Sequence, residues 1–288
     1  MKVQTVLTEP QGIIKKPQGI IKNLGVIGVG KMGGIIVRSV ADTVFPAKQI
    51  WVTDLDNTLV QQLCNEKGTN SANDIAALVE NTEIIFCAVT PSAVPHVLPQ
   101  VARVLSLPQW LISIAAGVTT TTLESYFDNA PPVVRVMPNI SASVGAAISV
   151  LTAGSAANQE HLKIAQQIFN ACGTSLVMDE HHLDAVTGVS GSGPAYVALF
   201  IEALADAGVH VGLSRSDAQK LATHTVLGAS KMLVETQEHP AELKNRVTTP
   251  GGTTAAGLHA LEQGGLRATL TEAILAATAR AKELGSTS

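Results

Sequence analysis

Short apolar runs alternate with amphipathic stretches over the first two thirds of the chain. The run Leu24–Gly28 is typical of a buried strand, and a glycine-rich turn then leads into a helix expected over 34–44. The same alternation predicts further strands at 50–53, 83–89, 110–115 and 133–136, helices at 56–66 and 159–170, and two added edge strands at 146–151 and 175–178. Strands that alternate with helices in this way indicate βαβ units and a mostly parallel sheet.

Beyond about residue 180 the strand pattern stops and the chain becomes helical. Helices are expected at 183–187, 195–207, 217–235, 241–247, 254–263 and 270–284. Ser214 fits the N-cap of one of them, because the carboxylate of Asp217 follows three residues later. These helices are rich in alanine and apolar on more than one face, and helices of that kind are usually buried. The helical half is therefore expected to associate with another copy or, alternatively, to pack on the sheet domain.

The first 23 residues form a separate N-terminal extension. The segment Pro-Gln-Gly-Ile-Ile-Lys occurs at 10–15 and again at 17–22. Two copies fall short of a repeat architecture, which needs three or more. We expect this extension to be peripheral to function, and its role stays open. The domain organisation expected from the sequence is an extension over 1–23, a sheet domain over 24–180 and a helical domain over 181–288.

The turn after the first strand has the spacing of a dinucleotide-binding loop. It consists of Gly28, Val29, Gly30, Lys31, Met32 and Gly33, and it lies between a strand and a helix, the context that the motif requires. The first glycine allows the tight turn, the second lets the backbone approach a pyrophosphate, and the third lets helix and strand pack closely. The helix N-terminus adds N–H donors and a partial positive charge. All six residues are therefore candidates for binding a nucleotide; the alternative is a glycine turn that serves packing alone.

A carboxylate follows the second strand. Asp54 lies 26 residues after Gly28, where it could accept hydrogen bonds from a ribose 2′-hydroxyl and would repel a 2′-phosphate. Asp56 and Asn57 continue a polar turn, so Asp54 could equally be a turn residue. The sequence leaves both interpretations open.

Three loops of small residues follow the later strands. The sequence has Ala88, Val89, Thr90 and Pro91 after the third strand, Ser-Ile-Ala-Ala-Gly at 113–117 and Asn139 after the fifth strand. Each alone is more typical of a structural turn. Since ligands lie at the carboxyl ends of the strands in doubly wound folds, all three together favour a cofactor crevice.

Two further segments stand out in the helical half. One is Val-Ser-Gly-Ser-Gly-Pro-Ala-Tyr at 189–196, and the other is Thr-Thr-Pro-Gly-Gly-Thr-Thr at 248–254, which opens a helix. A Gly-Gly turn with hydroxyls at a helix start offers several N–H and O–H donors to one small anion, such as a carboxylate. The alternative is a helix N-cap and nothing more.

Composition removes several classes of function. The chain has 288 residues, of which 46% are hydrophobic and 15% are charged. Its net charge of −4 gives no positive surface field to attract a nucleic-acid backbone, and its 3% of aromatic residues offer few side chains on which bases could stack. The absence of an apolar stretch of about 18 residues or of a secretory signal speaks against a membrane protein. Three widely spaced cysteines are typical of a reducing compartment, so we expect a soluble cytoplasmic protein, and the eight histidines have no metal-binding spacing.

Taken in order, these segments resemble the pyrroline-5-carboxylate reductase family from about Leu24 to Leu284. The most specific parts are Asp-Ala-Val-Thr-Gly-Val-Ser-Gly-Ser-Gly-Pro-Ala-Tyr at 184–196, His-Pro-Ala-Glu-Leu-Lys at 239–244 and Pro-Gly-Gly-Thr-Thr at 250–254. The resemblance implies an α/β fold with an N-terminal Rossmann-type doubly wound sheet followed by an all-α dimerisation domain. It implies reduction of 1-pyrroline-5-carboxylate to L-proline with NADPH or NADH, the last step of proline biosynthesis. It also implies an interlocked homodimer that assembles further into a decamer in some members, with the substrate pocket between one subunit's cofactor domain and its partner's helices.

The resemblance also implies roles for individual residues. Gly28 to Gly33 would hold the pyrophosphate, and Ala88 to Pro91 would line the cofactor, with Asp54 and Asn139 as further cofactor candidates. Ser190 and Ser192 would lie near the nicotinamide and the substrate. Gly251, Gly252 and Thr253 would bind the substrate carboxylate through backbone donors. Thr254 matches the threonine that hydrogen-bonds the ring nitrogen, and it is the candidate catalytic residue.

The chain departs from the family pattern at three places. Thr90 stands where the family usually has lysine, Ile140 and Ser141 stand where it has Thr-Pro, and Asp54 stands where members that prefer NADPH commonly have small polar or basic residues. The first and third leave the choice between NADH and NADPH open. A β-hydroxyacid dehydrogenase of similar plan is an alternative, but that chemistry normally needs a lysine that 183–200 lacks. A non-enzymatic nucleotide-sensing dimer is a second alternative, which Thr254 and the intact Gly-Gly turn disfavour.

Overall fold

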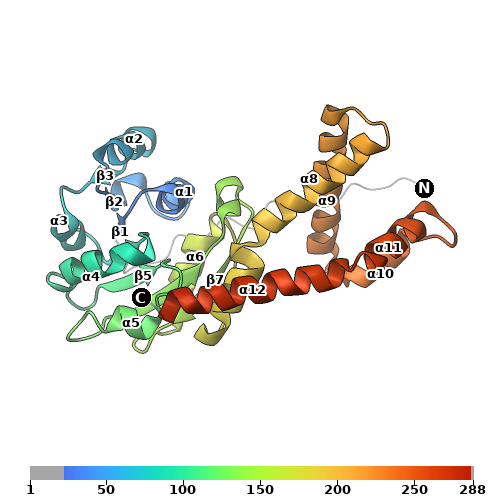
Figure 1. Cartoon of the computed structure of the whole chain (residues 1–288). Helices are drawn as coiled ribbons and strands as arrows, with labels where there is room; N and C mark the ends of the chain where they lie inside the picture. The colour runs from blue at the N-terminus through green and yellow to red at the C-terminus, as the bar shows by residue number, and fades with distance from the viewer. Residues whose placement is uncertain (1–22, 287–288) are drawn as a thin grey trace, which may run out of the picture. The chain divides into compact units, whose positions relative to one another are not determined.

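The computed structural model describes residues 23–286 and divides them into two compact units (Figure 1). The first unit runs to Val186 and includes the chain from Ala281 onward, and the second unit is Thr187–Arg280. The duplicated segment of the expected extension lies outside the described residues.

One eight-stranded sheet organises the first unit. Its strands are β1 (Leu24–Ile27), β2 (Ile50–Thr53), β3 (Asn70–Ser71), β4 (Ile84–Cys87), β5 (Trp110–Ser113), β6 (Val133–Met137), β7 (Ala147–Ala153) and β8 (Gly173–Val177). Their order in the sheet is β3-β2-β1-β4-β5-β6-β7-β8, with β7 antiparallel to β6 and every other pairing parallel. All residues of β1, β4 and β5 are buried, as expected for parallel strands covered on both faces. The predicted α/β fold class is confirmed.

Helices cover both faces of this sheet. The helices of this unit are α1 (Lys31–Val40), α2 (Asn57–Lys67), α3 (Ile75–Glu80), α4 (Val94–Ala102), α5 (Thr120–Glu124), α6 (Gln159–Asn170) and α7 (Leu183–Val186). One apolar core joins α1, α2 and α6 to the sheet, where the rings of Phe86 and Phe169 meet edge to face with centroids 5.9 Å apart. A second core joins α3, α4 and α5 to the opposite face, around Leu78, Leu98 and Leu111. This two-sided arrangement is the doubly wound one, and it leaves the carboxyl ends of the strands free for a ligand.

The first helix differs from its expected position over 34–44. It begins at Lys31, because Gly30 of the glycine-rich turn serves as its N-cap. It ends at Val40, because Asp42 adopts a left-handed conformation with φ of 63° and an isolated bridge joins Ala41 to Phe45. The glycine-rich turn is therefore continuous with the helix start.

The second unit is helical, as expected. It begins with a π-helical turn (Thr187–Gly191) and continues with α8 (Gly193–His210), α9 (Arg215–Thr236), α10 (Pro240–Arg246), α11 (Thr253–Gln263) and most of α12 (Leu266–Ser286). Ser214 caps α9 by accepting a hydrogen bond from the Asp217 N–H, as predicted.

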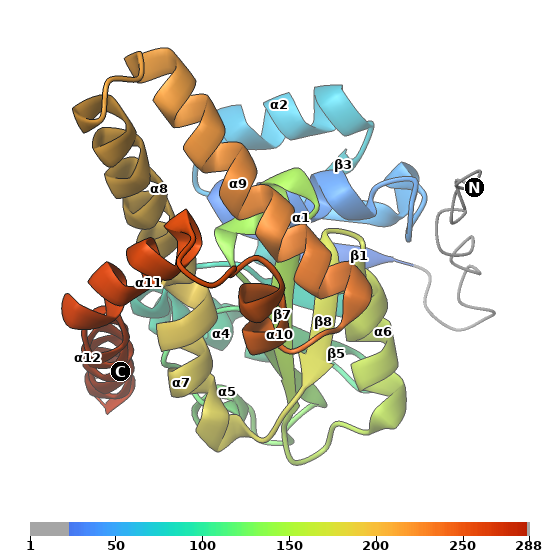
Figure 2. The same cartoon turned by 90° about the vertical axis from the view of Figure 1, so that its right-hand side faces the viewer.

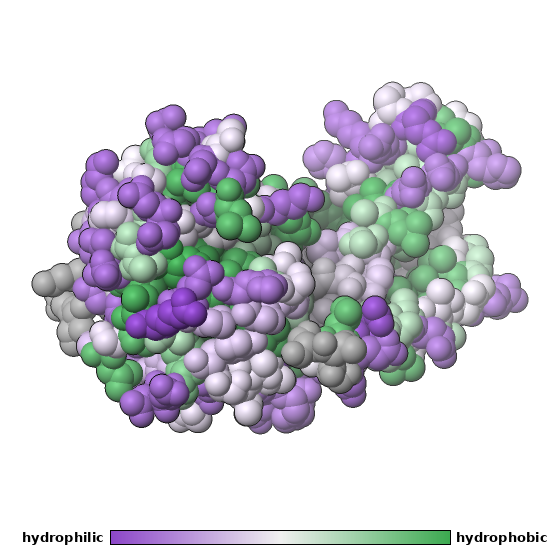
Figure 3. All heavy atoms as spheres, turned by 60° about the vertical axis from the view of Figure 1, so that its left-hand side comes forward, coloured by the Kyte–Doolittle hydropathy of each residue, from purple (hydrophilic) through white to green (hydrophobic). Residues whose placement is uncertain are grey.

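This unit has little apolar core of its own. The buried cluster described within it consists of Ala205, Ala218 and Ala222, where α8 packs on α9. Large apolar side chains are exposed along its helices, and apolar surface is visible among polar patches in Figure 3. The exposed apolar side chains include Leu199, Phe200, Leu204, Leu221, Leu227, Met232 and Leu275. Exposed apolar surface of this extent is typical of a face that another protein chain covers.

Candidate active site

The glycine-rich turn is shaped to receive an anion. Gly28 has φ of +90°, and a Cβ there would lie 2.8 Å from the Ala88 carbonyl oxygen. A Cβ on Gly33 would lie 1.9 Å from the Gly28 carbonyl oxygen, so helix and turn pack more closely than any side chain allows. At Gly30, by contrast, a Cβ would meet no heavy atom within 4 Å. No side chain caps α1, so the N–H groups at its start are left available to an anion such as a pyrophosphate.

Asp54 is bound to this turn. Its Oδ2 accepts a hydrogen bond from the Val29 N–H at 2.7 Å, and its Oδ1 accepts one from the Asp56 N–H at 3.0 Å. The Gly28 N–H donates to the Thr53 carbonyl at 2.9 Å alongside. Asp54 therefore has a structural role in the turn, and each carboxylate oxygen keeps a lone pair that a ribose hydroxyl could use.

The other cofactor candidates lie at the same edge of the sheet. Ala88 continues β4 with a hydrogen bond from its N–H to the Ile27 carbonyl, and Thr90 shares a hydroxyl hydrogen bond of 3.1 Å with Ser92. Asn139 follows β6 and is buried. The strands β2, β1, β4, β5 and β6 are parallel neighbours in the sheet, so their carboxyl ends form one continuous edge. Figure 2 gives a second view of the sheet, turned by 90°. The structure thus brings the candidate cofactor residues to one edge, and their roles stay predictions.

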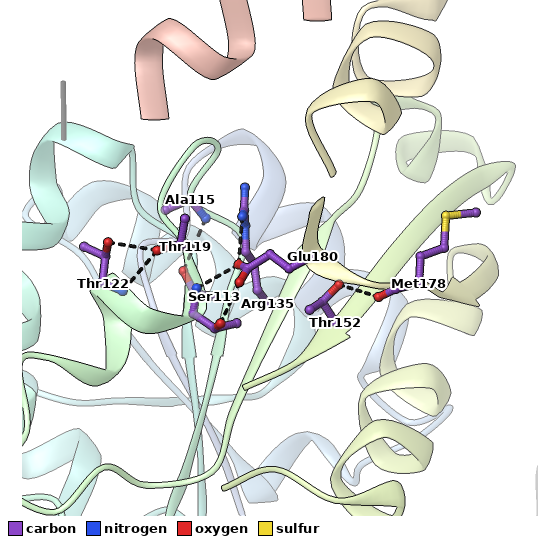
Figure 4. Close-up of polar contacts among 9 residues, drawn as sticks. Ser113, Ala115, Thr119, Thr122, Arg135, Thr152, Met178 and Glu180 are labelled. Atoms are coloured by element: carbon purple, nitrogen blue, oxygen red, sulfur yellow. Dashed lines mark hydrogen bonds and ion pairs between the residues drawn. The ribbon is translucent and has the colours of Figure 1, made fainter. Parts of the chain in front are cut away.

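A buried ion pair lies beside this edge and was not predicted from the sequence. Glu180 accepts hydrogen bonds from Arg135 Nη1 at 2.8 Å, from the Thr120 N–H at 2.8 Å and from Thr120 Oγ1 at 2.7 Å (Figure 4). The side chain of Arg135 is 6% exposed and that of Glu180 is 26% exposed. Burial alone would raise the pKa of Glu180, but the hydrogen bonds from Arg135 and Thr120 outweigh it and hold the pKa below its usual value. These residues are 45 and 60 positions apart in the sequence, so no local pattern could have revealed the pair.

The same three residues hold together the segments around the crevice. Arg135 lies on β6, next to Ser113 of β5 in the sheet register, and Thr120 is the first residue of α5. Glu180 opens a short helical turn, Glu180–His182, that leads into α7. A cavity of about 380 Å³ adjoins the pair and is lined by Gly117, Thr119, Arg135, Glu180, His181, Asp184, Lys282 and Gly285.

The candidate substrate residues lie in the second unit, at two helix starts. Ser190 belongs to the π-helical turn before α8, and Ser192 precedes the first residue of α8; both are half-buried. Gly251 has φ of +67°, and a Cβ on Gly252 would lie 2.3 Å from the Thr249 hydroxyl, so this turn requires both glycines. Gly252 caps α11 without a side-chain hydrogen bond, so no capping side chain occupies the N–H groups at the start of this helix.

The Ser190–Ser192 segment and the Gly251–Thr254 turn belong to the starts of two different helices. In Figure 1 the turn before α11 lies at the far end of the helical unit from the start of α8. The two candidate substrate segments therefore lie at different ends of the helical unit.

The described residues hold no metal centre and no membrane span. Between Asn23 and Ser286, no three side chains of the metal-ligating types gather at one place. Over the same range, none of the helices combines the length and the apolar composition needed to cross a bilayer. The three cysteines are free thiols.

Two family models match the chain. A model described as pyrroline-5-carboxylate reductase dimerisation matches residues 180–284, and one described as NADP oxidoreductase, coenzyme F420-dependent, matches residues 23–117. The first covers the helical unit, and the second covers the glycine-rich turn and the loops that follow β4 and β5.

Individual relatives match over nearly the whole chain. The pyrroline-5-carboxylate reductase of Methanosarcina acetivorans is 41% identical over 92% of this chain and 98% of its own, and that of Arabidopsis thaliana is 42% identical over 91% and 95%. Among solved structures, a pyrroline-5-carboxylate reductase from Coxiella burnetii superimposes with a TM-score of 0.88 at 33% identity, covering 91% of this chain and 98% of its own. The pyrroline carboxylate reductase of Plasmodium falciparum, solved with NADP bound, has a TM-score of 0.80 at 32% identity with the same coverage.

Proposed function

The chain belongs to the pyrroline-5-carboxylate reductase family, and we propose how its residues carry out the family's reaction. The reaction is the reduction of 1-pyrroline-5-carboxylate to L-proline by hydride transfer from NADPH or NADH, the last step of proline biosynthesis. The observation that carries this function is identity of about 40% with such reductases over more than nine tenths of the chain.

The nucleotide would lie along the carboxyl edge of the sheet. Gly28 to Gly33 would hold the pyrophosphate with the N–H groups at the start of α1, which no side chain occupies. Ala88 to Pro91 and Asn139 would line the nicotinamide half. The bound dinucleotide supplies the hydride, so the protein needs mainly to bring the two rings to about 3–3.5 Å and to exclude water.

The substrate would be held at the start of α11. Backbone N–H groups of Gly251, Gly252 and Thr253 would bind its carboxylate, helped by the positive end of the helix dipole. The Thr254 hydroxyl would hydrogen-bond the ring nitrogen, which takes up a proton from water to form the iminium before the adjacent carbon accepts the hydride. Since the iminium carbon is already a good hydride acceptor, no strong acid is needed, and the described site supplies none.

We propose that each active site takes residues from two chains. The turn at Gly251–Thr254 and the Ser190–Ser192 segment lie at opposite ends of the helical unit in one chain, so a second copy would bring them together. The dimerisation family model and the exposed apolar helices support a homodimer. A decamer of five dimers, as in some family members, and a cytoplasmic location consistent with three free cysteines are part of the same proposal.

Cofactor preference would depend on Asp54. Its carboxylate at the end of β2 disfavours a 2′-phosphate nearby, while the family habit favours NADPH. We therefore propose that both cofactors support turnover.

Initial rates separate the three candidate functions. Oxidation of NADPH or NADH, followed at 340 nm, is measured with 1-pyrroline-5-carboxylate, and reduction of the oxidised cofactors is measured with 3-hydroxy acids. Turnover with the imine alone supports the proposal. Turnover with hydroxy acids alone would identify a β-hydroxyacid dehydrogenase, and nucleotide binding without any turnover would identify a sensing protein.

Subunit complementation tests the shared site. Gly30→Glu places an acid where the pyrophosphate is expected, in open space that accepts a Cβ, and Thr254→Ala removes the hydroxyl. Each variant alone is expected to have little activity. When both are coexpressed, a site built from two chains regains activity, because one site of each mixed dimer has an intact crevice and an intact threonine. Mixed dimers without recovered activity would mean that each site is built within one chain.

A further inference from the structure

The end of α12 packs closely against the loop that follows β5. Gly117 of this loop has φ of +78°, and a Cβ there would lie 3.1 Å from both the Cα atom and the amide nitrogen of Gly285. In the other direction, a Cβ on Gly285 would lie 2.8 Å from the Gly117 carbonyl oxygen. Both glycines belong to the first unit, although they are far apart in the sequence. The two backbones therefore meet more closely than a side chain on Gly285 would allow.

Hydrogen bonds hold this loop at both of its ends. Before it, the Ile114 N–H donates to the Cys87 carbonyl at 3.3 Å, beside the last residue of β5. After it, the Thr120 N–H donates to the Glu180 carboxylate at 2.8 Å. The contact with Gly285 lies between these two anchors. The end of α12 therefore supports the middle of the loop, where no hydrogen bond to the sheet is needed to fix it.

The loop lies where the nicotinamide ring is expected. In the sheet, β5 stands between β4 and β6, and the residues proposed to line the nicotinamide half of the cofactor follow those two strands. The loop after β5 consequently lies between them at the same edge. Its residues at 113–117 are Ser-Ile-Ala-Ala-Gly, and the small ones let a flat ring approach the backbone. A displacement of this loop would therefore move the nicotinamide ring relative to the bound imine.

We propose that Gly285 is a positioning residue for hydride transfer, because it lets the end of α12 set the position of the loop after β5. This rests on the proposed reductase function and its nucleotide site. Gly285 acts through Gly117 and not on the reacting atoms. A methyl group on Gly285 would push the Gly117 carbonyl away from α12. Hydride transfer needs the two rings at about 3–3.5 Å, and a misplacement of about 1 Å can cost on the order of a hundredfold in rate, so a smaller shift has a smaller but measurable effect.

The proposal predicts how Gly285→Ala changes the kinetics. The kcat should fall roughly three- to tenfold. The deuterium isotope effect on kcat, measured with NADPH deuterated at its transferable position, should rise, because hydride transfer becomes slower relative to the other steps. The dissociation constant of NADPH should change less than about threefold, since the glycine-rich turn is untouched. A mere loss of folded protein would lower the amount of active enzyme but leave the isotope effect as it is in the wild type.

Steady-state kinetics of the full-length protein with 1-pyrroline-5-carboxylate provide the test. Gly228→Ala is the matched control, because Gly228 also lies in a long helix, α9, and a Cβ there would meet no heavy atom within 4 Å. If Gly285→Ala does not fold, Ala281→Gly replaces it. Ala281 is 8% exposed and lies one turn before Gly285, so this change loosens the same end of α12 without adding an atom.

A lower kcat together with a larger isotope effect in Gly285→Ala, or in Ala281→Gly where the first variant does not fold, supports the proposal if Gly228→Ala behaves as the wild type does. An unchanged isotope effect in the variant at the end of α12, or the same changes in Gly228→Ala, overturns it. A wild type that binds NADPH but does not turn over the imine would contradict the proposed reductase function instead, so the two failures are distinguishable.

Discussion

Replacing Glu180 by glutamine removes the negative charge from the buried pair beside the crevice. In the wild type its carboxylate accepts three hydrogen bonds of 2.7–2.8 Å, from Arg135 and Thr120. Glutamine keeps one oxygen acceptor but leaves the 6% exposed guanidinium of Arg135 without its countercharge. Breaking a fully buried pair costs about 3–5 kcal/mol, and the 26% exposure of Glu180 reduces this. We predict a loss of about 2 kcal/mol in the free energy of unfolding at pH 7.

The pH dependence has a definite sign. Because the folded pKa of Glu180 lies below its ordinary value of 4.5, the carboxylate stabilises the fold above that pH. This contribution is lost as the pH falls through the lower folded pKa. The difference in stability between the wild type and Glu180→Gln should therefore be full at pH 7 and shrink below about pH 4.5.

A second arginine–glutamate pair provides the control. Arg38 Nε and Glu66 Oε2 are also 2.8 Å apart, but these side chains are 44% and 45% exposed. Glu66→Gln should therefore lower the free energy of unfolding by less than about 1 kcal/mol. Urea unfolding of the wild type and both variants at one fixed protein concentration measures the losses, since the stability of a protein that self-associates depends on its concentration. If Glu180→Gln and Glu66→Gln lose the same free energy of unfolding, or if the loss in Glu180→Gln does not depend on pH, burial does not strengthen the pair between Arg135 and Glu180.

Four further outcomes are expected. Thr254→Ala should lower kcat by on the order of tenfold to a thousandfold with unchanged NADPH affinity, measured by steady-state kinetics and fluorescence titration. Light scattering at micromolar concentration should find a dimer or larger assembly and no 29.9 kDa species, since subunit interfaces of this kind bury on the order of 2,000 Å². Asp54→Ser should raise the NADPH/NADH ratio of kcat/KM several-fold, because the repulsion between the Asp54 carboxylate and the 2′-phosphate of NADPH at about 4 Å is on the order of 1 kcal/mol in water. An unchanged ratio would mean that Asp54 is a turn residue only. Burial raises the pKa of Cys87 to about 12 and of Cys172 to about 11, so iodoacetamide at pH 8 should modify Cys64 alone, as counted by intact-protein mass.

Local signals in the sequence predicted much of the fold. The helices of the second unit begin and end within a few residues of their expected positions, because caps such as Ser214 with Asp217 act over three residues. The strand–turn–helix around Gly28 was likewise predicted, since Gly28 and Gly33 permit close contacts within the turn, although the helix begins at Lys31 rather than at residue 34. The two-residue strand β3 and the helices α3, α4 and α5 were not predicted; β3 and α5 in particular are too short to carry a period.

Features that depend on contacts between distant parts of the chain could not be predicted from the sequence. Nothing in the alternation of 146–151 indicates that β7 runs antiparallel to β6, because period two carries no strand direction. The pairing of Arg135 with Glu180 depends on how the chain returns to the sheet after β8. That the turn before α11 and the start of α8 lie at different ends of the helical unit also depends on the arrangement of the helices in space.

The most direct test of the reductase function follows the hydride itself. The enzyme is incubated with 1-pyrroline-5-carboxylate and NADPH carrying deuterium at the transferable position of the nicotinamide ring, and the product is analysed by mass spectrometry. The product should be L-proline heavier by one mass unit, with deuterium on the former imine carbon and one oxidised cofactor per proline. Proline without deuterium, or cofactor oxidation without proline, would contradict it.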